Sequence, residues 1–182
     1  MERICITALF FVVFAWQSFS QEISVPEPEF TGIVLLVKPD GQAEQLEKQK
    51  AASASRADIG AALFGVSKAK GMNMVSGVQS PVRNAASEKL AFIVRVKEND
   101  RDPVEVINLF RMEVDLKKER RTIVTGTVNF NQTTAADIEF IPFHASKYGQ
   151  NSYLVQVSDL TPGEYALTLD GSRDVFNLFG ID

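Results

Sequence analysis

One segment of the chain gathers residue types that could bind a ligand or take part in catalysis. It contains His144, the only histidine, followed closely by Lys147 and Tyr148. Residues 144–150 lie between two predicted strands, and we expect them to form a loop that a rigid scaffold presents to a partner. His144, Lys147 and Tyr148 are therefore the candidate binding residues, and an ordinary solvated loop is the alternative.

A hydrolase is one kind of enzyme that His144 could serve. The histidine would act as general base for Ser146 or Ser152, and an acid such as Asp137 would orient its imidazole ring. The sequence contains no Gly-x-Ser-x-Gly motif to mark a nucleophile. We therefore predict no catalytic residues and a protein that is not an enzyme, with a hydrolase that uses His144 as an alternative function.

Metal ligands are scarce in this sequence. A zinc site usually has three or four His or Cys ligands, and besides His144 the chain offers only Cys5. The acidic run over residues 98–102 has oxygen ligands but lacks the Asp-x-Asp-x-Asp-Gly spacing of a calcium loop. Asp137 and Glu139 would share the solvated face of a strand, without the opposing acid that a glycosidase needs. We predict no metal and no cofactor.

The charge pattern argues against a nucleic-acid partner. The chain has a formal net charge of −4 and no basic stripe that could follow a phosphate backbone. Lys117, Lys118, Arg120 and Arg121 form a small basic cluster. Because Glu119 lies in the middle of this cluster, we predict a solvated turn there.

Sugar binding without catalysis is the main alternative function, that of a carbohydrate-binding accessory protein. Such a surface usually presents a flat, exposed aromatic side chain. The only tryptophan, Trp16, falls within the predicted signal peptide. Tyr153 and Tyr165 are expected to point into a core, which leaves Tyr148 as the tyrosine available to a sugar.

The N-terminus has the pattern of an export signal. Arg3 precedes an apolar run over residues 4–16, and the small residues Ser18 and Ser20 mark a predicted cleavage site. We therefore predict a signal peptide over residues 1–20. The mature chain should be periplasmic or extracellular, without stable membrane insertion, because no later apolar run approaches the length of a membrane span.

The rest of the chain fits one domain built mainly of β-strands. Residues 21–31 contain two prolines and few apolar side chains, so we expect an extended tether there. Residues 32–182 are long enough to bury a single core. They begin with a hairpin over residues 33–48 that turns at Pro39-Asp40-Gly41. The Ala- and Ser-rich residues 50–70 are expected to form a short helix or a loop.

The clearest strand pattern covers residues 110–117, where apolar and charged side chains alternate. Phe110, Met112, Val114 and Leu116 should face the core. Upstream, Asp102-Pro103 predicts one helical turn. Short strands at roughly ten-residue spacing indicate an antiparallel β-sandwich. The other predicted strands cover residues 72–77, 91–96, 122–129, 138–143, 153–157, 165–169 and 175–179.

The segment Leu160-Thr161-Pro162-Gly163-Glu164-Tyr165 has the pattern of a tyrosine corner. At such a corner the tyrosine ring lies in the core and its hydroxyl bonds the upstream main chain, while a Pro-Gly pair makes the turn. Pro162, Gly163 and Tyr165 are therefore the predicted structural residues.

The last three predicted strands resemble those of immunoglobulin-like and fibronectin type III-like domains. They also resemble a class of uncharacterised exported bacterial proteins that end in a similar corner and a Phe-Gly closing strand, here Phe179-Gly180. The resemblance implies an immunoglobulin-like sandwich without the disulfide and core tryptophan of antibody domains. We expect an exported, non-catalytic binding or structural module whose partner is a protein or a glycan.

Overall fold

The structure is a computed structural model that describes residues 24–57, 68–86, 89–129, 132–135, 138–172 and 174–182. Regular structure in these residues is almost entirely β-strand, apart from the helical turn α2 (Pro103–Val106) and the 3-10 turn η1 (Leu116–Lys118). The prediction of an all-β fold is confirmed. Asp102 caps α2 by accepting a hydrogen bond from the Val104 N–H at 3.0 Å, as Asp102-Pro103 predicts. The predicted signal peptide lies outside the described residues.

The smaller sheet has, in the described part of the chain, five antiparallel strands in the order β11–β12–β7–β1–β2. The predicted opening hairpin is present as β1 and β2, and its turn is closed by the Lys38 N–H, which donates to the Gln42 carbonyl at 2.8 Å. The strands of this sheet are β1 (Val34–Val37), β2 (Ala43–Gln45), β7 (Leu90–Arg95), β11 (His144–Tyr148) and β12 (Ser152–Val157).

The larger sheet has nine strands within the described ranges. Its main order is β3–β14–β13–β8–β9–β5–β4, with β10 beside β9 and β6 beside β14. Only the pair of β6 and β14 is parallel among these described strands. The strands are β3 (Glu47–Lys50), β4 (Ala52–Ala57), β5 (Lys68–Ser76), β6 (Arg83–Asn84), β8 (Ile107–Asp115), β9 (Arg120–Asn129), β10 (Gln132–Ala135), β13 (Gly163–Leu169) and β14 (Val175–Ile181).

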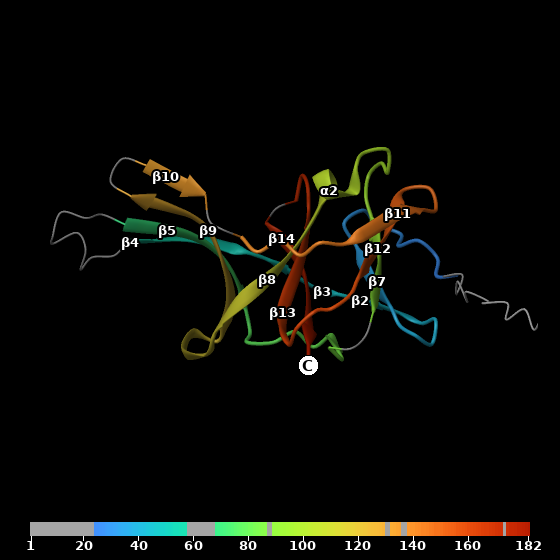
Figure 1. Ribbon diagram of the computed structural model, residues 1–182, viewed down its shortest axis with the longest axis horizontal. Coiled ribbons are helices and arrows are strands. Elements are labelled where there is room, and N and C mark those ends of the chain that lie inside the picture. The colour runs from blue at the N-terminus through green and yellow to red at the C-terminus, as the bar shows by residue number, and fades with distance from the viewer. Residues whose placement is uncertain (1–23, 58–67, 87–88, 130–131, 136–137, 173) are drawn as a thin grey trace, which may run out of the picture.

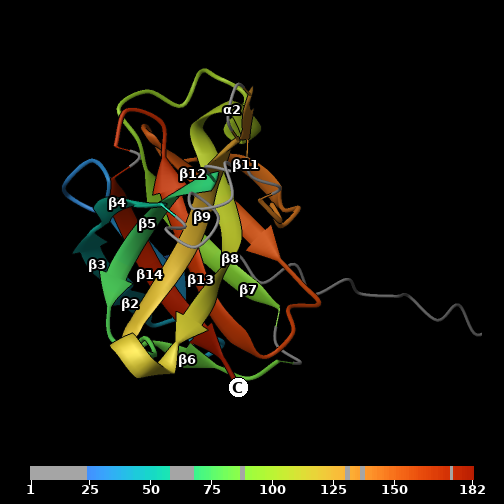
Figure 2. The ribbon, with the colours of Figure 1, turned by 90° about the vertical axis from the view of Figure 1, so that its left-hand side faces the viewer.

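The larger sheet curls back on itself. Only Ala51 separates β3 from β4, yet β3 pairs with β14 at one end of the sheet order and β4 pairs with β5 at the other. Where these pairings meet, the Gln49 side chain accepts a hydrogen bond from the Ser76 N–H at 3.0 Å and donates to the Ser76 carbonyl at 3.1 Å. The sheet is therefore rolled toward a barrel, as the view from the side of β4 and β5 shows (Figure 2).

Beyond the curl, β4, β10 and the adjoining parts of β5 and β9 extend away from the sandwich as an arm (Figure 1). Composition favours a short helix or a loop over residues 50–70, but residues 52–57 and 68–70 are strand, so the prediction is wrong there. Pairing of β5 with β4 on one side and β9 on the other outweighs the weak local preference of small residues. Residues 58–67 lie outside the described residues.

Two apolar cores flank the central strands β13 and β14. In the main core, between the sheets, the ring centroid of Phe179 lies 5.1 Å from that of Phe92 and 5.5 Å from that of Tyr165. In the second core, inside the curl, Phe110 and Phe176 meet edge to face at 5.6 Å. Consecutive residues of β13 and β14 are buried, and alternate residues of a strand face opposite sides. Both faces of these two strands are therefore covered by a core.

The tyrosine corner is tied to β8. Tyr165 is 1% exposed, and its hydroxyl donates to the Thr161 carbonyl at 2.7 Å. The Arg111 guanidinium reaches across from β8 and donates to the Pro162 carbonyl at 2.7 Å. A Cβ atom on Gly163 would lie only 2.9 Å from the Arg111 Nε, so glycine permits this approach. Pro162, Gly163 and Tyr165 thus join the corner to both the core and the neighbouring strand.

The predicted alternation over residues 110–117 holds for only part of its length. Phe110 and Met112 are buried, but Val114 is 41% and Leu116 74% exposed. β8 ends at Asp115 and leads into η1, beyond the reach of the second core. The prediction that Val114 and Leu116 face the core is wrong.

The predicted solvated turn is wrong for Arg121, which lies in β9 and is 0% exposed. Its guanidinium donates to both carboxylate oxygens of Glu47 at 3.1 Å and to one oxygen of Glu164 at 3.3 Å. It also donates to the main-chain carbonyls of Ser76, the last residue of β5, and of Gly77, the residue after it. Glu164 is 4% exposed and is held in addition by Arg83 and by the Ser80 N–H at 2.8 Å. A buried ion network thus joins β3, β6, β9 and β13.

Candidate functional site

A groove of about 680 Å³ opens between the two sheets, on the side where residues 138–143 pass from beside β8 into β11. Both sheets contribute to it. Its apolar lining consists of Leu90, Ala91, Ile141, Pro142, Phe143, Val157, Leu160 and the ring of Tyr165, and its polar rim of Lys89, Arg111, Glu139, His144, Gln156, Ser158, Asp159 and Thr161.

The floor of the groove is apolar because it is the margin of the main core. Leu90, Val157 and Leu160 are each at most 7% exposed and belong to that core. β11 begins at His144, opposite Gln156, whereas β12 continues beyond this pair. The groove therefore lies just beyond the point where the pairing between β11 and β12 ends.

One wall of the groove is the connection over residues 138–143, which the sequence predicts to be a strand. That prediction is wrong, because the connection is irregular apart from an isolated bridge between Phe140 and Phe110. The Ile141 N–H donates to the Leu109 carbonyl of β8 at 2.8 Å, and the chain then crosses to the other sheet. Pro142 has no N–H to continue a ladder at the crossing.

The rim of the groove carries charges of both signs. The Arg111 guanidinium is held by the tyrosine corner, and the Ser158 hydroxyl donates to the Asp159 carboxylate at 2.8 Å. Lys89 and Glu139 are exposed. A ligand in the groove would meet an apolar floor and a rim with polar groups of both signs, which is the usual composition of a binding site.

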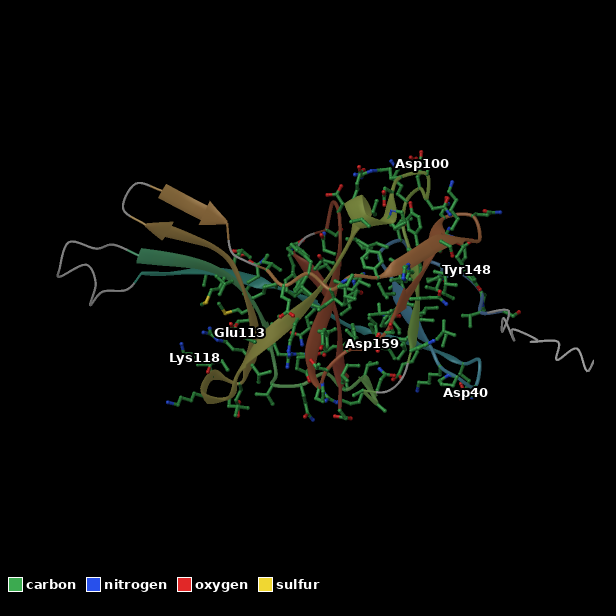
Figure 3. The ribbon with its side chains drawn as sticks, viewed as in Figure 1. Asp40, Asp100, Glu113, Lys118, Tyr148 and Asp159 are labelled. Atoms are coloured by element: carbon green, nitrogen blue, oxygen red, sulfur yellow. The ribbon has the colours of Figure 1, made fainter. Side chains whose placement is uncertain are left out.

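The three candidate binding residues do not surround one cavity. Residues 144–148 form strand β11, so the prediction of a loop there is wrong. His144 lies at the groove, whereas Lys147 and Tyr148 lie at the other end of the strand, next to the β11–β12 turn. Figure 3 shows Tyr148 at that end of β11. The Tyr148 hydroxyl donates to the Val25 carbonyl, which ties this tyrosine to the N-terminal segment.

The pairings that a hydrolase would need are not formed among the described residues. His144 makes no side-chain hydrogen bond to a serine or an acid there, and Ser152 donates instead to Glu27 at 2.6 Å. Asp137 lies outside the described residues. Within the same part of the chain, no three His, Cys, Asp or Glu side chains cluster as metal ligands would.

Glu27 is a residue that sequence reasoning missed. Its carboxylate accepts hydrogen bonds from the Arg95 side chain, the Ser152 hydroxyl at 2.6 Å, the Asn151 N–H at 3.1 Å and the Gln150 N–H. The N-terminal segment is thereby fastened to the β11–β12 turn and to β7. Two prolines flank Glu27 in sequence, but no motif indicated that a carboxylate between them would find four donors.

The environment of Glu27 sets its ionisation. Burial acts to raise the pKa of Glu27, but hydrogen bonds from Ser152, Gln150, Asn151 and Arg95 outweigh it and lower the pKa from 4.5 to about 2. Because the pKa in the folded state lies below that of the unfolded chain, the ionised carboxylate stabilises the fold. This contribution is full above about pH 4.5 and is lost as the pH falls toward 2.

The variant Glu27→Gln should unfold more easily at neutral pH, by about 1–2 kcal/mol, because a neutral amide cannot replace an ionised acceptor of four hydrogen bonds. Urea unfolding of both proteins at several pH values tests this. The difference should be largest at pH 7 and should shrink below about pH 4.5. The exposed neighbour Glu29→Gln is the control, and a difference that stays constant with pH would contradict the linkage.

Comparison of the chain with protein-family models, with curated proteins and with solved structures found no match. None of the helices in the described ranges has the length and apolar character required to cross a membrane. The groove and its surroundings are therefore the basis on which a function can be assigned.

Proposed function

We propose that this chain is an exported, non-catalytic binding module with an immunoglobulin-like sandwich, and that the groove is where it binds a partner. The observation that carries the proposal is the combination of an apolar floor with a polar rim in a cavity of about 680 Å³. The export pattern over residues 1–20 and the tyrosine corner at Tyr165 support the cellular location and the type of sandwich.

Binding is favoured over catalysis because the polar groups of the rim are engaged with their neighbours rather than with His144. Arg111 bonds the main chain of the corner, and Ser158 bonds Asp159. General acid-base catalysis requires a proton donor and acceptor within hydrogen-bonding distance of one another or of the substrate. The described residues around His144 offer no such relay, whereas their mixture of charges suits recognition.

A protein partner is favoured over a glycan. The Tyr165 ring that borders the groove is 1% exposed, so it offers no flat face to a sugar. Tyr148 is fastened to Val25 and does not line the groove. The apolar floor of the groove is suited to an apolar side chain, which a protein partner can supply.

The variant Ser158→Trp should weaken binding strongly, because an indole at the exposed rim position would occupy the groove. Ligands are first selected with the wild-type chain from a peptide display library and, separately, from a glycan array. Titration calorimetry should then show at least a tenfold weaker Kd for the Ser158→Trp chain.

The matched control is Gln45→Trp, which places the same side chain on β2, the opposite edge strand of the same sheet. Both variants should keep the wild-type unfolding midpoint, since Ser158 and Gln45 are exposed. Ligands that bind wild type and Ser158→Trp equally well would show that the groove is not the binding site.

A further inference from the structure

We propose that the sandwich has a second binding site, a cavity at the end of the main core opposite the groove. This site takes a small neutral compound with an apolar body and one O–H or N–H donor. The cavity has a volume of about 330 Å³ and shares no lining residue with the groove. The inference therefore goes beyond the proposed function and does not depend on it.

The cavity lies at the other end of the strands that border the groove. The groove reaches Leu90, the first residue of β7, whereas the cavity reaches Val96, which follows the last residue of that strand. On β13 the groove reaches Tyr165 near the start of the strand, and the cavity reaches Leu169 at its end. Asp100, which lines the cavity, lies at the end of the molecule that carries α2 (Figure 3). The two sites therefore occupy opposite ends of the space between the sheets.

The walls of the cavity are apolar because they belong to the main core. Val96, Val106 and Leu169 are each at most 7% exposed and are members of that core. Val175 of β14 is half-buried and adds to the apolar lining. A cavity of this size and composition suits a small organic molecule, since ligand sites usually have volumes of about 300–1,000 Å³.

Asn177 of β14 places a polar group among these apolar side chains. It is 3% exposed and lines the cavity. Its side-chain nitrogen donates to the Leu167 carbonyl of β13 at 3.3 Å. This bond sets the orientation of the amide, because the flipped form would place two carbonyl oxygens against each other. The side-chain oxygen of Asn177 therefore points away from Leu167.

The side-chain oxygen of Asn177 is an acceptor without a donor. No described residue bonds it, and it is not among the fully enclosed side-chain atoms that lack a partner, which in the described ranges are Asn84 Nδ2 and Arg120 Nε. An unpaired atom that the protein does not enclose faces open space, and the open space beside Asn177 is the cavity. Because buried polar groups usually have a partner, we expect a ligand to supply the donor.

This single acceptor selects the chemistry of the ligand. A carboxylate or phosphate would bring its negative oxygens against the oxygen of Asn177. An ammonium ion would lose its hydration among apolar walls for one neutral acceptor, and burial of such a charge costs far more than one hydrogen bond contributes. A neutral O–H or N–H donor has a smaller desolvation cost and completes the hydrogen bonding of the amide.

The charges at the mouth of the cavity do not alter this selection. Arg101 forms an ion pair with Asp170 at 3.1 Å, and the Lys48 ammonium group donates to the Gly32 carbonyl at 3.0 Å. The exposed lining residues within the range 97–100 add charges of both signs. Neither sign dominates the described part of the entrance, so it gives a charged ligand little advantage.

The test uses the full mature chain, labelled with ¹⁵N, and two probes of the same shape. One probe is 4-methylphenol, which carries the donor, and the other is p-xylene, which has a methyl group in its place. Saturable binding of 4-methylphenol should shift the side-chain amide signal of Asn177 and the main-chain amide signals of Val96 and Leu169. The charged analogues 4-methylbenzoate and 4-methylbenzylammonium should bind at least about tenfold more weakly than 4-methylphenol.

The variant Asn177→Leu removes the acceptor and keeps a side chain of similar length. The ratio of the 4-methylphenol affinity to the p-xylene affinity should fall at least about tenfold, because only the phenol loses a hydrogen bond. The ratio cancels changes of cavity shape that affect both probes alike. Asn73→Leu is the matched control, since Asn73 is half-buried in β5 and does not line the cavity, and it should leave the ratio unchanged.

The variant Ser172→Trp tests the location and decides the matter if Asn177→Leu does not fold. Ser172 is exposed at the mouth, so an indole there would block the cavity without entering the core. It should weaken 4-methylphenol at least tenfold, whereas Ser158→Trp at the groove should not.

Three results would overturn the second site. They are an unchanged affinity ratio in Asn177→Leu, an unchanged 4-methylphenol affinity in Ser172→Trp, and wild-type protein whose signals near Asn177 do not shift with 4-methylphenol. The side-chain oxygen of Asn177 would then be hydrated only. A groove ligand that Ser158→Trp displaces would still support the proposed function, so the two ideas fail separately.

Discussion

Replacing Arg121 with methionine is expected to lower the free energy of unfolding by about 3–5 kcal/mol, the usual cost of removing one member of a buried ion network. Arg121 is fully buried, and its guanidinium is the group that joins the carboxylates of Glu47 and Glu164. Methionine would fill much of the same space but would leave Glu47 without its arginine partner. Glu164 would keep only the Arg83 side chain and the Ser80 N–H as partners. Urea unfolding at neutral pH measures the loss.

The matched control is Lys118→Met, which removes a positive charge from the exposed turn η1 of the same predicted basic cluster. Its free energy of unfolding should change by no more than about 0.5 kcal/mol, as is usual for a surface site. A loss below about 1 kcal/mol in Arg121→Met would show that the network contributes little.

A second variant separates the charge from the packing. The triple variant Arg121→Met, Glu47→Gln, Glu164→Gln removes the uncompensated acids together with the cation, so it should be more stable than Arg121→Met alone. A triple variant as unstable as the single one would assign the loss to packing around the side chain.

Arg121 also shows what the sequence could not predict. Local pattern placed it with Lys117, Lys118 and Arg120 in a solvated turn, because adjacent basic residues usually face water. Its burial depends on Glu47 and Glu164, which lie 74 and 43 residues away in the chain. Nothing in the local sequence of Arg121 distinguishes it from Arg120, so only the tertiary fold reveals the network.

Strands that bury one or both faces against a core were predictable from their local sequence. β12, β13 and β14 match the predicted strands closely, because apolar and β-branched residues are bounded there by turn-forming residues. β11 was missed because its five residues, His-Ala-Ser-Lys-Tyr, carry no alternating apolar pattern. An edge strand with little burial is specified by pairing with its neighbour rather than by its own composition.

The candidate site was predictable only at one point. His144 stood out as the single histidine, and it does border the groove. The rest of the groove is assembled from β7, β8, β12 and the corner, which are distant in sequence and share no motif. Lys147 and Tyr148 follow His144 in sequence, but the extended geometry of β11 carries them away from the groove.

Replacing Tyr165 with phenylalanine is expected to cost about 1–3 kcal/mol of unfolding free energy, because the part-buried hydrogen bond from the Tyr165 hydroxyl to the Thr161 carbonyl would be lost. The ring itself would remain, so its stacking on Phe179 should be unchanged. Denaturant unfolding followed by near-ultraviolet circular dichroism measures both the stability and the packing of the aromatic stack.

Thr161→Val is the control for this prediction, since it deletes the exposed Thr161 hydroxyl but keeps the main-chain carbonyl that Tyr165 binds. It should therefore cost less than Tyr165→Phe, even though the hydroxyl also accepts a hydrogen bond from Arg111 at 3.2 Å. If Tyr165→Phe left the unfolding midpoint unchanged, the hydroxyl would contribute nothing to the corner. The proposal of an immunoglobulin-like sandwich would then lose its main support, because the hydrogen bond is the feature that distinguishes a tyrosine corner from an ordinary buried aromatic residue.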